Sequence, residues 1–417
     1  MTILASCTAA LLVALIGATL YLPRWNASHQ QFPPAGMWVV ASAMTLVLAM
    51  LCAFALLVAI GGCVALYRDR CEERGIPYAP IRPRERIHGP MLLSILRCLF
   101  PRARLRPGEL VQVRSLPEIL ATLDAKGCLE GLPFMPEMAA YCGHRYPVMR
   151  RVDKIWEYVH LSGMRRVRNA VLLKTLRCDG RSHGGCQAAC QLIWKEAWLK
   201  QPGPDVPDAR GIAHRPDLSR LAHATVDGKS RYFCQMTEIM QASTRVGPRD
   251  VGHYWRDLVG GNIRLIPLLM EISIRVFNGT QWRLGRTMWP VFQPGRSESS
   301  PHQDLGLQPG QIVRVRSKHE IEPTLNRRFR NRGLEFGKDQ LFYSGGSYRV
   351  VARINQIVHE GTGEMLRFEI PSILLEGVNE IGGSILNPQN QFYFWREIWL
   401  EPQSPTAVSA DNHHRSS

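Results

Sequence analysis

Two long uncharged runs of apolar residues near the N-terminus constrain this chain more than any other feature. Residues 3–22 and residues 32–67 contain no Asp, Glu, Lys or Arg, and Arg24 is the only such residue before Arg68. Each run is at least as long as the roughly 20 residues that a helix needs to cross a hydrocarbon core. We therefore predict a two-helix transmembrane hairpin over residues 1–67.

The charges beside the two runs predict how this hairpin is oriented. The linker between the runs holds Arg24 alone, whereas six arginines follow the second run: Arg68, Arg70, Arg74, Arg82, Arg84 and Arg86. Because an excess of Lys and Arg marks the cytoplasmic side, we predict a multi-pass protein of the cell membrane with a cytoplasmic C-terminal body. A cleaved signal peptide is the alternative for the first run, but no positive residue precedes it and the sequence that follows, YLPRWN, is a poor cleavage site.

A duplication organises the body behind the hairpin. The segment PGELVQVRS, starting at Pro107, returns as PGQIVRVRS, starting at Pro309. Likewise WKEAWL, starting at Trp194, returns as WREIWL, starting at Trp395. A Pro-Gly turn, apolar residues and a capping-box pattern predict a strand and then a short helix at the start of each copy. We expect an α+β body in which each copy is a small, strand-dominated sheet or SH3-like barrel.

These patterns divide the chain into six segments. We predict the transmembrane hairpin at 1–67, a basic Pro/Arg-rich linker at 68–106, the first copy at 107–200, a partly helical insert at 201–307, the second copy at 308–402 and a disordered tail at 403–417. Within the insert, the stretch YFCQMTEIMQAS and residues 263–277 have helical patterns.

The second copy contains none of the 11 cysteines of the chain. In the first copy, Cys142 lies in YCGH, and three more cysteines lie in RCDGRSHGGCQAAC: Cys178, Cys186 and Cys190. The second copy has Ser344 in place of Cys142, Asn387 in place of Cys186 and Gln391 in place of Cys190. The tryptophans of the framework are retained while these sulfurs are absent together. Residues that differ as a set behave like one site, so we predict that the four cysteines bind one metal centre.

Four thiolates can complete a tetrahedral zinc site or hold an Fe–S cluster, and the sequence leaves both cofactors open. The glycine-rich loop between Cys178 and Cys186 can direct backbone N–H groups at sulfur, which tunes a metal centre. A thiol redox or disulfide pair and buried inert thiols are the alternatives, although a cytoplasmic location disfavours permanent disulfides. Three further residues are candidate ligands: His144, His183 and Cys234.

The sequence supports two classes of function. It contains no phosphate-binding, dinucleotide-binding, HExxH, GxSxG or EF-hand pattern, and it leaves open whether the protein is an enzyme. Our leading hypothesis is a membrane-anchored cytoplasmic metal-binding protein with a redox or sensing role. The alternative is a membrane-tethered scaffold that binds an anionic lipid or an acidic protein, since the net charge is +16. Nucleic acid is a less favoured partner because no recognition motif accompanies this charge.

Overall fold

The structure is a computed structural model that describes residues 35–73, 105–152, 154–157, 163–202, 221, 231–247, 250, 252–286, 289, 295, 300–380 and 390–403. The chain divides into two compact units, which we describe separately. The first unit is Met1–Tyr67 with Leu269–Val291, and the second is Arg68–Leu268 with Phe292–Ser417. The predicted first span, most of the linker and the predicted tail lie outside the described residues.

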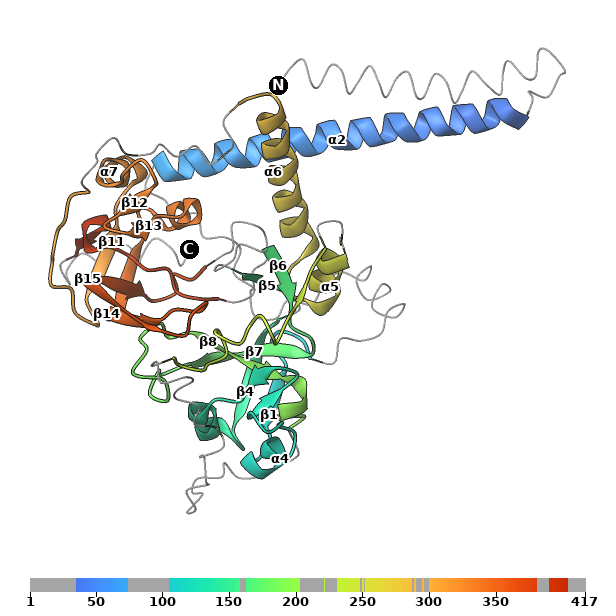
Figure 1. The fold of residues 1–417 in the computed structure, drawn as a ribbon. Coiled ribbons are helices and arrows are strands. Elements are labelled where there is room, and N and C mark those ends of the chain that lie inside the picture. The colour runs from blue at the N-terminus through green and yellow to red at the C-terminus, as the bar shows by residue number, and fades with distance from the viewer. Residues whose placement is uncertain are drawn as a thin grey trace, which may run out of the picture. The chain divides into compact units, whose positions relative to one another are not determined.

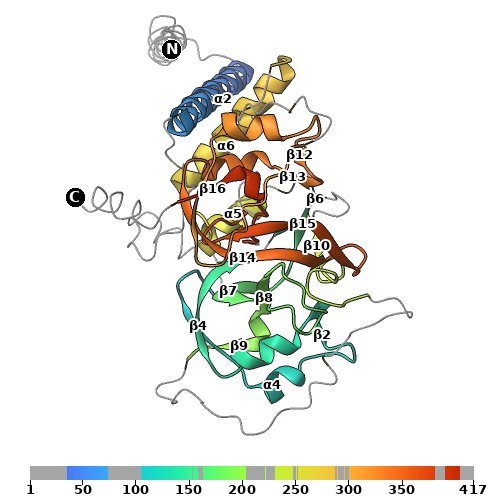
Figure 2. The same ribbon diagram turned by 90° about the vertical axis from the view of Figure 1, so that its left-hand side faces the viewer.

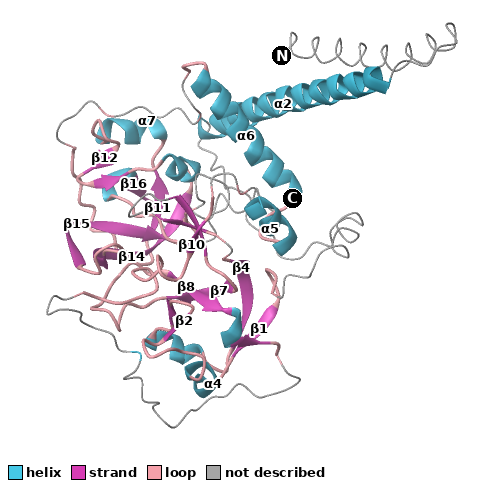
Figure 3. Cartoon of the chain, turned by 45° about the vertical axis from the view of Figure 1, so that its right-hand side comes forward, coloured by secondary structure: helices cyan, strands magenta, loops and turns pink. Residues whose placement is uncertain are grey.

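The first unit is built around one long apolar helix, α2 (Ala35–Glu73), drawn in blue in Figure 1. Within it, Ala49–Cys71 is long and apolar enough to cross a membrane, and little of that segment is buried. It is the one such helix in the described part of the chain. The second predicted apolar run is therefore helical. The unit also contains most of helix α6 (Leu265–Arg283), which crosses α2 in Figure 3.

The second unit is an α+β body, and its N-terminal half is the first copy. Strand β1 lies between β4 and β9 in an antiparallel five-stranded sheet of order β8-β7-β4-β1-β9. In chain order the elements are β1 (Leu110–Val113), α4 (Leu116–Leu120), β2 (Cys128–Leu129), β3 (Leu132–Pro133), the 3₁₀ helix η1 (Pro136–Tyr141), β4 (Arg145–Arg151), β5 (Ile155–Glu157), β6 (Gly163–Arg166), β7 (Ala170–Arg177), β8 (Gln191–Lys195), η2 (Glu196–Trp198) and β9 (Leu199–Lys200).

The second copy contains a similar series of elements in a sheet of order β15-β14-β11-β16 (Figure 2). The registers correspond, since Val111 pairs with Tyr146 in the first copy and Val313 pairs with Tyr348 in the second. The elements are β11 (Ile312–Val315), α7 (Lys318–Ile321), η4 (Glu322–Thr324), β12 (Arg330–Asn331), β13 (Leu334–Glu335), η5 (Lys338–Tyr343), β14 (Ser347–Val358), β15 (Met365–Leu375), η6 (Glu397–Trp399) and β16 (Leu400–Pro402).

The two copies also have the same core. The rings of Phe134 and Trp198 meet edge-to-face at 5.2 Å, and those of Phe336 and Trp399 do so at 5.0 Å. Such edge-to-face pairs contribute about 0.5–1.5 kcal/mol of stability beyond that from burial of their apolar area. The capping boxes are present in both copies, at the starts of α4 and α7. The tryptophans of the repeated WKEAWL and WREIWL segments are therefore core residues: Trp194, Trp198, Trp395 and Trp399.

Part of the insert completes the first copy. Strand β10 (Thr244–Arg245) pairs with β6 in a second antiparallel sheet, of order β10-β6-β5. The helix predicted at YFCQMTEIMQAS is wrong, because residues 235–241 form consecutive turns. There the buried amide of Gln235 bonds to the backbone of Pro133 and Ile193, and these contacts hold the segment against the first copy. The insert is helical in α5 (Gly252–Gly260) and in α6, where a helical pattern was predicted.

Candidate functional site

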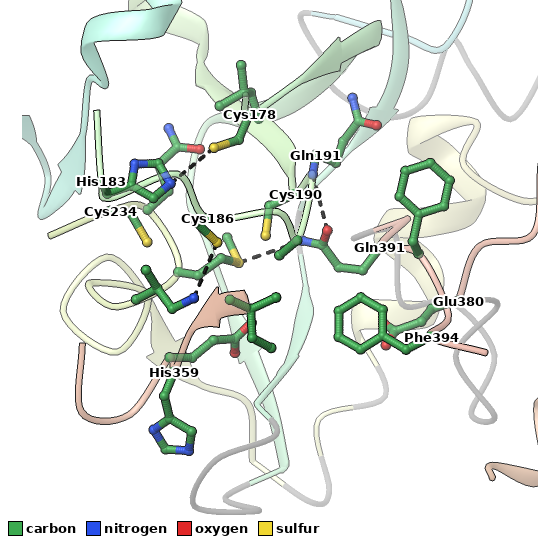
Figure 4. Close-up of a pocket in the computed structure, with 18 of the residues that line it drawn as sticks. Cys178, His183, Cys186, Cys190, Gln191, Cys234, His359, Glu380, Gln391 and Phe394 are labelled. Atoms are coloured by element: carbon green, nitrogen blue, oxygen red, sulfur yellow. Dashed lines mark hydrogen bonds between the residues drawn. The ribbon is translucent and has the colours of Figure 1, made fainter. Parts of the chain in front are cut away.

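A cavity of about 450 Å³ lies between the two copies, within the second unit. The first copy and the insert supply the sulfur-containing wall. The second copy supplies the opposite wall. Figure 4 shows four cysteines gathered around this space: Cys178, Cys186, Cys190 and Cys234. The fold therefore brings together three of the four predicted ligands and the cysteine of the insert.

Two close backbone contacts, one at its base and one further along, close the loop that joins β7 to β8. At its base, the Cys178 N–H donates to the carbonyl of Cys190 at 2.8 Å. Further along, Gly180 has φ of +69° and lies so close to Cys186 that a Cβ at position 180 would be 1.8 Å from the carbonyl oxygen of Cys186. Only glycine fits this position, because any side chain would meet both strain and a backbone clash. The glycine-rich sequence thus folds the loop back on itself and brings its ligand-type residues together.

Three ligand-type side chains of different chemistry converge at the loop. The Cys178 sulfur lies 3.2 Å from His183 Nε2 and 3.3 Å from Glu137 Oε1. The ligand atoms of Glu137, Cys178 and His183 all lie within 4.8 Å of one another, and this is the one such group among the described residues. Glu137 comes from η1, and the other two residues come from the loop.

A hydroxyl fixes the orientation of the histidine ring. Ser182 Oγ donates to Glu137 Oε2 at 2.5 Å and lies 3.1 Å from His183 Nδ1. Since the single hydroxyl proton goes to the carboxylate, the contact with the ring requires the proton on Nδ1 to face Ser182. The lone pair of His183 is then on Nε2, which faces Cys178. This is the arrangement in which an imidazole binds a metal ion.

His183 is buried, and Glu137 and Cys178 are partly buried. Burial affects the titration of the two loop residues. It raises the pKa of the Cys178 thiol, and the nearby Glu137 and Cys190 raise it further. It lowers the pKa of His183, so the ring is neutral near pH 7. Desolvation makes an anionic thiolate costly here unless a positive charge is supplied. A bound cation would offset this cost and favour the thiolate.

The rest of the cavity is acidic although the chain is basic. No described Lys or Arg contributes to its lining. Four glutamates do so: Glu137, Glu335, Glu360 and Glu380. Burial raises the pKa of Glu360 to about 7, and Glu380 and Glu157 add to this shift. A cavity lined by carboxylates, thiols and the thioethers of Met135 and Met236 favours a cation with affinity for sulfur.

The remaining thiols lie farther along the same cavity. The backbone N–H of Val358, in the second copy, donates to the sulfur of Cys186 at 3.3 Å. Burial raises the pKa of Cys234 to about 12, and it also raises the pKa of Cys190 well above the ordinary value. Glu360 raises the pKa of Cys190 further, as do Cys186 and Cys234, whereas Arg177 lowers it. These sulfurs line the same cavity, but they do not form a compact group with Cys178.

Cys142 lies apart from this group. It follows η1, is 4% exposed in the core of the first copy, and does not line the cavity. Its counterpart Ser344 is equally buried, at 3%. Both positions end the same turn, with the N–H of Cys142 donating to Ala139 and that of Ser344 donating to Leu341. A small buried side chain is thus what this position requires in both copies.

The second copy clamps the cysteine loop from the other side. Gln187 Oε1 accepts hydrogen bonds from the N–H groups of Asn355 and Gln356 at 2.7 and 3.2 Å. Gln356 Nε2 in turn donates to the carbonyl oxygens of Gly184 and Gly185. The loop that carries the ligand-type residues is therefore held by strand β14.

Sequence reasoning missed Glu137 and ranked His183 below the cysteines. No spacing could reveal Glu137, because its proximity to the loop arises only when η1 packs beside β7 and β8. The signal for His183 was its position between Cys178 and Cys186 in the glycine-rich loop.

The comparisons with known proteins find no match: no family model, no curated protein and no solved structure matches the chain. The function therefore has to be argued from the chemistry of the site itself.

Proposed function

We propose that this chain is a membrane-anchored metal-binding protein whose first copy holds a zinc-class ion at Cys178, His183 and Glu137. The single observation that supports this most strongly is the convergence of these three ligand atoms within 4.8 Å. Sulfur, nitrogen and oxygen ligands of this kind are those that Zn²⁺ takes in proteins. The fourth position goes to Cys186 or Cys190, or it stays open to water or a substrate.

Each residue has a distinct part in this proposal. Cys178 supplies a thiolate, His183 supplies Nε2, and Glu137 supplies a carboxylate oxygen. Ser182 holds both His183 and Glu137 and orients them as an outer-sphere partner. A bound cation would offset the desolvation that raises the pKa of Cys178, so that the ligand becomes a thiolate on binding.

The ligand set favours zinc over an Fe–S cluster. A cubane or two-iron cluster of the common kind takes four cysteine thiolates. Cys142, which the sequence offered as the fourth, lies in the core, and the four cysteines that do line the cavity do not form a compact group. The closest group contains one sulfur only.

A thiol enzyme is the competing reading of the same residues, because Cys178 and His183 are within hydrogen-bond distance. Catalytic cysteines have a lowered pKa, whereas burial raises the pKa of Cys178. Acyl transfer also builds negative charge on an oxyanion, which needs donors near it. The acidic lining of this cavity disfavours such a charge and favours a cation.

The membrane arrangement and the finer fold belong to the same proposal. The chain is anchored by the two-helix hairpin, with α2 as its second helix and the body on the cytoplasmic side. The excess of arginine after the second run supports this orientation. Both copies are SH3-like barrels, which the register shifts within their antiparallel sheets support, because a β-bulge bends a strand.

The test is the metal content of the full-length protein, purified in detergent without oxygen. We expect about one equivalent of zinc and no visible absorption. Cys178→Ser and His183→Ala should each lose the metal, whereas Cys142→Ser should keep it, because serine occupies the equivalent buried position 344. A folded protein without bound metal would contradict the proposal. A brown protein containing iron would contradict the zinc proposal and support an Fe–S cluster instead.

The scaffold function is the second candidate and rests on the net charge of +16. The described lining of the cavity has no Lys or Arg, so the cavity does not supply the basic surface that this function needs. If the folded protein binds no metal, its binding to vesicles with and without anionic lipid is the measurement that tests the scaffold function. Electrostatic attraction to anionic lipid is worth about 1 kcal/mol per basic residue near the surface.

A further inference from the structure

Helix α6 contacts the candidate membrane span directly. A Cβ at Gly61 of α2 would be 2.3 Å from the backbone oxygen of Ser273 and 2.7 Å from Cβ of Phe277. The neighbouring Gly62 faces the ring of Phe277, where an added Cβ would be 3.4 Å from the nearest ring atom. Small residues that let two backbones approach so closely are typical of helix packing within membranes.

The depth of this contact can be judged from the sequence of α2. Gly61 precedes Arg68, the first charged residue after the uncharged run, by about 10 Å at 1.5 Å per residue. Helices that lie in the membrane interface bury their apolar side chains about 5–10 Å below the headgroups. If the span α2 crosses a bilayer, α6 meets it at the depth of such an interface.

Large apolar side chains of α6 and of the turn after it are exposed in the structure. At the C-terminal end of the helix, Trp282 is 67% exposed, and Leu284 in the following turn is 61% exposed. Exposure of this extent at a helix end marks a surface with a partner. Because α6 contacts the candidate membrane span α2, lipid is the partner expected at these side chains.

The charges around α6 fit a lipid surface. Between residues 258 and 297 the only acidic residue is Glu271. The same segment contains five arginines: Arg264, Arg275, Arg283, Arg286 and Arg296. Tryptophan and arginine at a helix end are the residues that anchor a helix at the headgroup level, and Trp282 and Arg283 end α6. Glu271 is four residues before Arg275, a spacing at which opposite charges face each other on a helix.

We infer that α6 is a second membrane-contacting element, an interfacial helix that lies against α2 and places Trp282 and Leu284 among lipid acyl chains. Its arginines then face the phosphates of the headgroups. This inference rests on α2 as a membrane span and is independent of the metal site. It assigns to the insert the role of fixing the body at the bilayer surface.

The experiment is site-specific photocrosslinking in the full-length protein, reconstituted in vesicles of zwitterionic and anionic phospholipids. A benzophenone amino acid replaces one exposed residue at a time: Trp282 in α6, Phe54 in α2 or Leu366 in β15. We expect lipid adducts at positions 54 and 282, each several-fold above position 366. We also expect anionic lipid to be labelled preferentially at position 282 but not at position 54, because the arginines around α6 attract its phosphates.

The outcomes separate the two ideas. Adducts at position 54 without adducts at position 282 would overturn the role of α6 and leave the span intact. Absence of lipid adducts at both positions would overturn the span as well. Equal labelling at positions 282 and 366 would also contradict the inference, because β15 belongs to the body.

Discussion

Cys178 and Glu380 occupy the same position in the two copies and line the same cavity. The Cys178 N–H donates to Cys190, and the Glu380 N–H donates to Gln391, at 2.8 and 2.7 Å. The duplicated scaffold thus presents a thiol from one copy and a carboxylate from the other. The flanking residues also meet, since Arg177 donates to Asn379 at 3.2 Å. Equivalent positions of the two copies therefore line one cavity with different chemistry.

The hydroxyl of Ser182 should matter for metal affinity although it does not bind the metal. Ser182→Ala removes the group that orients both His183 and Glu137. Loss of such an outer-sphere partner weakens metal binding roughly 10–100-fold. Competition with a chelator of known affinity measures the effect, and Ser115→Ala, which removes a capping hydroxyl far along the chain in α4, is the control. Equal affinities for the Ser182 variant and the parent would contradict the proposed role.

Gly180→Ala should prevent closure of the cysteine loop. The substitution places a Cβ against the carbonyl of Cys186 and adds left-handed strain of roughly 1–2 kcal/mol. Gly143→Ala is a matched control, since Gly143 also has positive φ but nothing lies within 4 Å of its added Cβ. We expect the Gly180 variant to lose bound metal and the Gly143 variant to retain it. Metal content and thermal unfolding of both variants provide the measurement.

The raised pKa of Glu360 predicts that the stability of the metal-free protein depends on pH. This pKa is raised from 4.5 to about 7, so the folded state keeps a proton that the unfolded chain releases at lower pH. Stability should therefore fall as the pH rises from about 4.5 to about 7, and then level off. Glu360→Gln should flatten this part of the profile. Melting temperatures between pH 4.5 and pH 8 test it, and an unchanged slope in the variant would count against the buried carboxyl as its cause.

Gln356 should link the second copy to the metal loop. Gln356→Ala removes two hydrogen bonds to Gly184 and Gly185, each worth about 1 kcal/mol. We expect faster hydrogen exchange in residues 183–187 and faster metal release, with little change in the overall fold. Gln308→Ala removes a similar side chain that bonds to nearby Gly306 and not to the cysteine loop, and it should change neither rate.

The two adjacent glycines of α2 should respond differently to alanine. Gly61→Ala forces the new Cβ into the backbone of Ser273, whereas Gly62→Ala makes an ordinary contact with Phe277. We expect the Gly61 variant to separate α6 from α2 and to lose lipid adducts at position 282, and the Gly62 variant to behave like the parent. The yield of these adducts is the measurement. Similar yields from both variants would show that the close contact does not hold α6.

The pattern of apolar residues was enough to predict the helix α2, the repeated strands and the buried tryptophans. These features depend on local periodicity and on burial, which the order of residues along the chain reveals directly. The helix at YFCQMTEIMQAS failed because Gln235 bonds to strands of the first copy, and such tertiary contacts outweigh the local helical preference.

The same difference between what the sequence predicts and what tertiary contacts decide applies to the candidate site. The sequence by itself determined that a glycine-rich loop carries Cys178, His183, Cys186 and Cys190, and that the second copy has no equivalent sulfur. Only the tertiary structure decided that Cys142 points into the core and that Glu137, from the same short 3₁₀ turn, faces the loop. The reason is physical: spacing along the chain says which residues are neighbours in a turn. The packing of η1 against its sheet sets the direction in which each side chain of that turn points.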